Sequence, residues 1–118
     1  MRTLVLLLVL GSGATLAAEE SADRQIDFGL KVAQKGLWQE ARFRFERAVQ
    51  AEPTNAAALN NLAVSLEQMG DFAGARKAYE KALELKPDDA YIQQNYDLFR
   101  EADDKRNRKN KRKQRPQP

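Results

Sequence analysis

Apolar side chains recur from about residue 22 onwards at the spacing of amphipathic helices. Residues three, four or seven positions apart share one face of an α-helix, so each such stripe indicates a helix with one buried side. Glycine or proline separates successive stripes. The pattern predicts five helices, at about residues 22–35, 38–51, 56–69, 72–85 and 90–104.

Two segments within this pattern align without a gap at an interval of 34 residues. They are Gly36–Pro53 and Gly70–Pro87, and six of their 18 positions are identical. Gly36 and Gly70 are expected to end a helix in the left-handed conformation that glycine adopts without steric cost. After each glycine, small and aromatic residues form a stripe that is expected to pack between helices, and a proline then ends the helix. In the first segment these residues are Ala41, Phe45, Ala48 and Pro53, and in the second they are Ala75, Tyr79, Ala82 and Pro87. Asn55 or Asp88 is expected to cap the next helix.

These residues, with the aromatic Trp38 and Phe72, resemble the tetratricopeptide repeat (TPR) family over roughly residues 22–104. The resemblance implies an all-α fold, an α-solenoid of two TPR helix-turn-helix repeats at about 22–55 and 56–89 with a C-terminal capping helix at 90–104. The chain departs from the family where Val32 and Leu66 replace a tyrosine and where Gln25 replaces a large apolar residue.

The resemblance also implies a concave groove, lined by the first helix of each pair, that holds a peptide or protein segment. The candidate lining residues are Asp23, Ile26, Asp27, Leu30, Asn60, Asn61, Val64, Gln68, Tyr91, Gln94 and Asn95. A solvated polar helix face is the alternative interpretation of the same residues.

One TPR subtype grips a terminal carboxylate with Lys, Asn, Asn, Lys and Arg. Of the corresponding positions here, only Asn61 matches, so we expect a neutral or basic guest beside Asp23 and Asp27. Two and a half repeats bury little core, and we expect a partner or self-association into a homo-oligomer to supply further burial.

The N-terminus has the order of a secretory signal peptide. Arg2 precedes the apolar run Leu4–Leu10, and small residues follow up to Ala18. Residues 1–18 are therefore expected to be a signal peptide of a small bacterial protein that is periplasmic or secreted, with membrane association left open. An uncleaved anchor is the alternative, although crossing a bilayer takes about 20 apolar residues.

Composition narrows the function classes. The chain has no cysteine and no histidine, which removes disulfides, thiol nucleophiles and the usual zinc ligands. We expect no catalytic residues, no cofactor and no metal site, and therefore a protein-interaction scaffold or assembly factor of the cell envelope and not an enzyme. The run Arg42–Phe45 does not indicate nucleic-acid binding, because Phe45 belongs to the core stripe while Arg42 and Arg44 can pair with Glu46 and Glu40 one turn away.

The formal charge of +3 conceals an uneven distribution. Residues 19–104 carry 11 Lys and Arg against 17 Asp and Glu, whereas residues 105–118 carry eight basic residues and no acidic one. We expect residues 105–118 to form a disordered tail. Its cations are candidates for binding polyanions, above all an anionic membrane surface, with nucleic acid disfavoured: Lys105, Arg106, Arg108, Lys109, Lys111, Arg112, Lys113 and Arg115. An envelope tether built on this tail is the alternative function.

Overall fold

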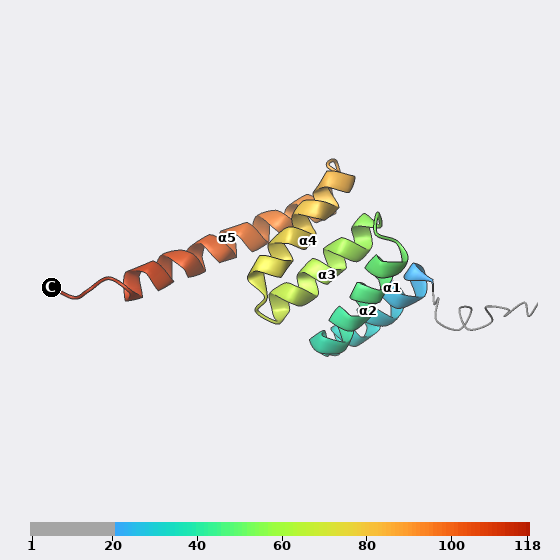
Figure 1. The fold of residues 1–118 in the computed structure, drawn as a ribbon, viewed down its shortest axis with the longest axis horizontal. Coiled ribbons are helices and arrows are strands. Elements are labelled where there is room, and N and C mark those ends of the chain that lie inside the picture. Colours follow the sequence, from blue (N-terminus) through green and yellow to red (C-terminus); the bar gives the residue numbers. More distant parts are fainter. Residues whose placement is uncertain (1–20) are drawn as a thin grey trace, which may run out of the picture.

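The computed structural model describes residues 21–118, and the predicted signal peptide at residues 1–18 lies outside the described residues. The described part contains five α-helices: α1 (Ala22–Gln34), α2 (Trp38–Ala51), α3 (Ala56–Gln68), α4 (Phe72–Leu85) and α5 (Ala90–Lys113). Helices α1 and α2 form one antiparallel hairpin and α3 and α4 a second, and α5 packs on α4 (Figure 1). The start and end predicted for each of the helices α1–α4 are confirmed to within one residue.

Helix starts recur at the same interval of 34 residues. Ser21, Asn55 and Asp89 are the N-cap residues of α1, α3 and α5, and each side chain accepts a hydrogen bond from a backbone amide in the first turn. The predicted Asn55 cap is confirmed. The predicted Asp88 cap is wrong, because Asp89 Oδ1 accepts from the amides of Tyr91 and Ile92 at 3.0 and 3.1 Å. The third unit therefore starts in register with the other two.

The turns inside the two hairpins use glycine as predicted. Gly36 and Gly70 have φ of 74° and 83°, in the left-handed region where a side chain is strained. Each turn is closed by a backbone hydrogen bond from the residue after the glycine, at 3.0 Å from Leu37 to Val32 and at 2.9 Å from Asp71 to Leu66.

The core runs along the stack between the helices. Ala41, Ala48, Ala75 and Ala82 are each 0% exposed, which lets neighbouring helices approach closely. The rings of Phe45 and Tyr79 fill the space beside them and are also buried. Tyr79 donates a hydrogen bond to Glu67 at 3.0 Å, and its burial raises its pKa above the ordinary tyrosine value. The repeat stripe predicted from the sequence is thus the core.

Gln25 occupies the first-repeat position that Leu59 fills in the second. It is 1% exposed, and its amide oxygen accepts a hydrogen bond from Arg44 Nη1 at 3.5 Å. Arg44 also pairs with Glu40 at 3.0 Å, and Arg42 pairs with Glu46 at 2.7 Å. Both ion pairs predicted for the Arg42–Phe45 run are confirmed.

The C-terminal helix is longer than the sequence predicts. The predicted end at residue 104 is wrong, since α5 continues to Lys113 and residues 105–113 are helical and not disordered. Lysine and arginine are good helix formers, and no glycine or proline occurs between residues 90 and 115. Figure 1 shows the end of α5 projecting past the other four helices. We call residues 104–113 the arm.

Candidate functional site

The first helices of the three units form one face of the stack, which we call the α1–α3–α5 face. Helix α3 contacts both α1 and α5. Ile26 of α1 packs against the buried cluster of Ala22, Ala48 and Ala58, and Asn95 of α5 donates a hydrogen bond to Asn60 of α3 at 3.2 Å. These contacts hold the predicted groove-lining stripes next to one another.

The predicted lining residues fall into two groups by exposure. Ile26, Asn60, Asn61, Val64 and Asn95 are buried or half-buried, whereas Asp23, Asp27, Leu30, Gln68, Tyr91 and Gln94 are exposed. Asn60 is only 2% exposed, and its amide oxygen accepts the bond from Asn95. Asn60 therefore links α3 to α5 and does not offer a free amide to a guest. The exposed group is the surface that a partner can reach.

Apolar area is exposed on this face beside polar groups. Leu30 of α1 is 42% exposed, Tyr91 of α5 is 65% exposed and Leu98, about two turns further along α5, is 59% exposed. Gln94 lies on the same side of α5 as Tyr91 and Leu98 by helical spacing, and Gln68 lies on the same side of α3 as Val64. The combination offers a protein segment both apolar contact and hydrogen-bonding amides.

Charge along the face changes sign from one end to the other. Asp23 and Asp27 stand one turn apart on α1, the α3 stripe carries amides and Val64, and the α5 stripe leads into the cations of the arm. The face is therefore negative at the exposed side of α1 and positive along the arm.

A buried carboxylate fixes the base of the arm. The side chain of Asp103 is 11% exposed and pairs with Arg76 of α4 at 2.8 Å and with Arg106 of its own helix. These guanidinium groups, Arg76 first, hold the pKa of Asp103 below its ordinary value of 3.8. Arg106 in turn lies over the ring of Phe72, 3.2 Å from its centroid. We call these contacts the Asp103 junction.

An aromatic cluster completes the α4–α5 contact. The ring centroids of Tyr79 and Phe99 are 5.4 Å apart, and those of Tyr79 and Tyr96 are 5.8 Å apart. Arg76 lies 5.4 Å from the Phe99 centroid. The cluster and the Asp103 junction together keep the start of the arm on α4.

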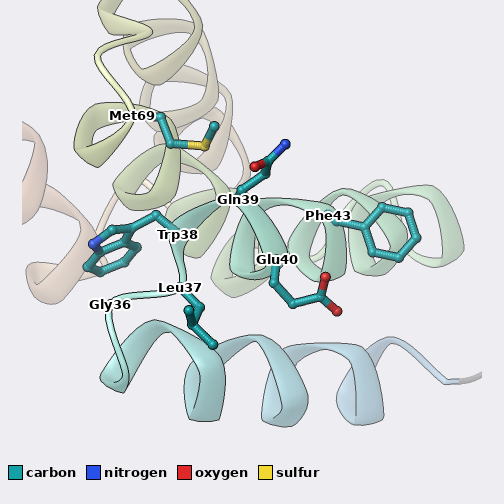
Figure 2. Close-up of a pocket in the computed structure, with 7 residues that line it drawn as sticks. All are labelled: Gly36, Leu37, Trp38, Gln39, Glu40, Phe43 and Met69. Carbon is teal, nitrogen blue, oxygen red and sulfur yellow. The ribbon is translucent and has the colours of Figure 1, made fainter.

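A separate depression lies at the α1–α2 turn, and none of the predicted groove residues lines it. Its volume is about 880 Å3, and it is lined by Gly36, Leu37, Trp38, Gln39, Glu40, Phe43 and Met69. Figure 2 shows Leu37 directed towards α1 and Phe43 directed away from the other lining residues. The sequence signal for this surface was the presence of Leu37 and Phe43 outside the shared repeat stripe, and both are about half exposed.

Residues 21–118 contain no cluster of three or more acidic, histidine or cysteine residues placed to hold a metal ion. Among the helices of this same region, none is both long and apolar enough to span a membrane.

Comparison with known proteins supports the repeat fold. Residues 56–89 match the family model of the tetratricopeptide repeat. The chain is also similar to the crystal structure of the Sgt2 TPR domain from Aspergillus fumigatus, with a TM-score of 0.70 at 20% sequence identity. That similarity covers 77% of this chain and 60% of the Sgt2 chain, so this chain spans about three fifths of its length. No curated protein matches the chain.

The architecture is therefore all-α, with TPR-type helix-turn-helix packing and a C-terminal helix. A TPR domain is generally a protein–protein interaction module and typically non-catalytic.

Proposed function

We propose that this protein is a scaffold or assembly factor that holds a segment of another protein against the α1–α3–α5 face. The observation that carries the proposal is that Leu30 and Tyr91, on the two outer helices of this face, are exposed, as are the amides of Gln94 on α5 and Gln68 on α3. Exposed apolar groups bordered by polar ones are typical of surfaces that bind protein.

The side chains indicate how a segment would be held. Leu30 and Tyr91 offer apolar contact, while side-chain amides donate and accept hydrogen bonds with the main chain of a guest, whatever its sequence. Asp23 and Asp27 favour a basic residue of the guest at the α1 end. The face therefore suits an extended or helical segment that has apolar anchors.

We also propose that the protein works in a bacterial cell envelope, either in the periplasm or after secretion. The support is the order of residues in the first 18 positions and the lack of cysteine. Fractionation of expressing cells, with N-terminal sequencing of the purified chain, tests this part separately. Recovery of the full-length chain in the cytoplasm would overturn it.

Crosslinking inside cells tests the binding face. A photoreactive residue is placed at Gln68 or Gln94 on the face, and at Lys77 or Lys81 on α4 as matched controls, since all four side chains are exposed. We expect mass spectrometry to find the same protein at both face positions and not at the α4 positions. Equal capture from both sides of the stack would refute the proposed face.

The alternative function is a tether in which the arm holds the protein on anionic lipid. Deleting residues 105–118 separates the two functions. A tether loses flotation with anionic vesicles and all partner capture, whereas a scaffold still captures its partner through the α1–α3–α5 face. Complete loss of capture, as distinct from weaker capture, would therefore count against the scaffold.

A further inference from the structure

One continuous strip of side chains runs along α5 from the α1–α3–α5 face to the end of the arm. Its members alternate at steps of four and three residues, a spacing that keeps them on one side of a helix. We call it the α5 strip, and it consists of Tyr91, Asn95, Leu98, Ala102, Lys105, Lys109 and Arg112. At about 1.5 Å per residue it is roughly 30 Å long.

The first half of the α5 strip carries two exposed apolar side chains, on either side of the half-buried Asn95. Tyr91 and Leu98 are 65% and 59% exposed, more than any other large apolar side chain in residues 21–118. The residues that follow them, Ile92 and Phe99, each lie about 100° further around the helix and are 2% and 1% exposed, because they pack in the core. Helix α5 thus has one apolar side that α3 and α4 cover and an adjacent apolar side that the described residues leave exposed.

The second half of the α5 strip is basic and lies on a helix. Ala102, Lys105 and Lys109 border one shallow depression, together with Arg106, Asn110 and Lys113. Arg112 continues the strip by helical spacing, three residues after Lys109. The Asp103 junction ties the base of this segment to α4 through the 2.8 Å pair with Arg76. Charges fixed on a helix lose less conformational entropy on binding than charges on a flexible tail.

We propose that the α5 strip binds an acidic amphipathic helix of a protein partner. Apolar side chains of that helix lie over Tyr91 and Leu98, and its carboxylates lie over Lys109 and Arg112. Two helices that pack side by side meet through positions alternating at four and three residues, which is the spacing of the strip. The inference rests on the proposed function and names the chemistry of the partner.

Membrane and nucleic acid fit the strip less well. Residues 100–118, which include the arm, contain no aromatic or large aliphatic side chain. The arm therefore has no side chain to insert among acyl chains. Phosphate recognition draws on the cations all around the arm and has no use for Tyr91 or Leu98. A protein segment with apolar and acidic side chains uses both halves of the strip.

The test uses a matched pair of charge reversals in the full chain. Lys109→Glu with Arg112→Glu changes the strip. The control is Arg108→Glu with Lys111→Glu, which changes the net charge by the same amount. Arg108 and Lys111 each come one residue before a strip residue, and so they lie about 100° away from the strip around the helix. The probe is a labelled synthetic helical peptide of about 25 residues, with leucines on one half of a single face and glutamates on the other half. Binding is measured by fluorescence anisotropy.

We expect the strip reversal to weaken peptide binding about tenfold and the control reversal to weaken it about threefold or less. Leu98→Ser should also weaken peptide binding several-fold. Equal losses from the two reversals, no effect of Leu98→Ser, or no peptide binding at all would overturn the inference. So would duplex DNA or phosphatidylserine vesicles binding as tightly as the peptide with no dependence on Leu98.

The outcome is separable from that of the proposed function. Crosslinking at Gln68 depends on the α3 part of the face and not on the arm. If the two charge reversals weaken peptide binding equally but the partner is still crosslinked at Gln68, the scaffold proposal stands and the acidic-helix inference is wrong.

Discussion

Gly29 is a site of tight packing between the two helices of the first hairpin, and it gives a prediction for stability. Gly29 of α1 lies against the ring of Phe45 of α2. A Cβ atom at position 29 would lie 2.5 Å from Phe45 Cε1 and 2.9 Å from Cδ1 and Cζ. Phe45 is 2% exposed, so its ring has little room to move. Ala63, at the same position in the second repeat, carries a Cβ and is fully buried.

Two effects oppose each other when Gly29 is changed to alanine. Alanine is favoured over glycine inside a helix by about 1 kcal/mol. Forcing an extra carbon into a packed core costs about 1–3 kcal/mol. Because the contact distances are far below van der Waals separation, we expect the clash to prevail and the variant to lose about 1 kcal/mol, equivalent to roughly 4–8 °C in Tm.

The assay is urea unfolding followed by far-ultraviolet circular dichroism, with Phe45→Leu as the control background. Phe45→Leu alone should destabilise the fold because it opens space in the core. In that background Gly29→Ala should stabilise by about 0.5–1 kcal/mol, since the ring is gone and only the helix preference remains. If Gly29→Ala stabilises the unmodified chain to the same extent, the close packing inferred for this hairpin is refuted.

Two further predictions concern the turns and the arm. Gly70→Ala should lower the free energy of unfolding by about 1 kcal/mol, because residue 70 has a φ of 83° that alanine adopts only with strain; unchanged urea curves would contradict this. Asp103→Asn should lower stability by about 1–2 kcal/mol at neutral pH, because it weakens the contacts with Arg76 and Arg106. The folded-state pKa of Asp103 is below its ordinary value. The difference in free energy of unfolding between the unmodified chain and the variant is therefore fully present above about pH 4 and declines as the pH falls further. Urea curves from about pH 7 down to about pH 2 check this, and a difference that stays constant with pH would disprove the role of the carboxylate.

Much of the fold could be predicted because each repeated residue has a local task. Gly36 and Gly70 end α1 and α3 because the backbone there takes a positive φ. Alanines such as Ala41 and Ala75 let neighbouring helices pack closely. Such constraints act over a few residues, so spacing alone locates the first four helices. The N-cap at Asp89 was open to the same logic, because it lies 34 residues after Asn55.

The arm was missed for a reason that spacing does not reveal. The density of cations after residue 104 indicates disorder when the segment is taken alone. The structure holds its base through Asp103 and Arg76, which are 27 residues apart and in different helices. A tertiary ion pair of this kind has no periodic signal in the sequence.

The candidate face was predicted only in part. Helical spacing groups Asp23, Asp27 and Leu30 on one side of α1 and Tyr91 and Gln94 on one side of α5, and all five are exposed. Spacing does not tell a surface amide from a buried one. Whether an asparagine meets water or a neighbouring asparagine depends on how closely two helices pack, as at Asn60.

The most direct test of the central claim compares two leucines of similar exposure. Leu30 lies on the α1–α3–α5 face and is 42% exposed, whereas Leu85 ends α4, away from that face, and is 37% exposed. The measurement is the affinity of each serine variant for the partner segment identified by crosslinking, determined by titration calorimetry. The account predicts that Leu30→Ser weakens binding about fivefold, because it removes apolar contact worth about 1 kcal/mol, while Leu85→Ser leaves the affinity unchanged. Equal affinities for the two variants, or a larger loss from Leu85→Ser, would contradict it.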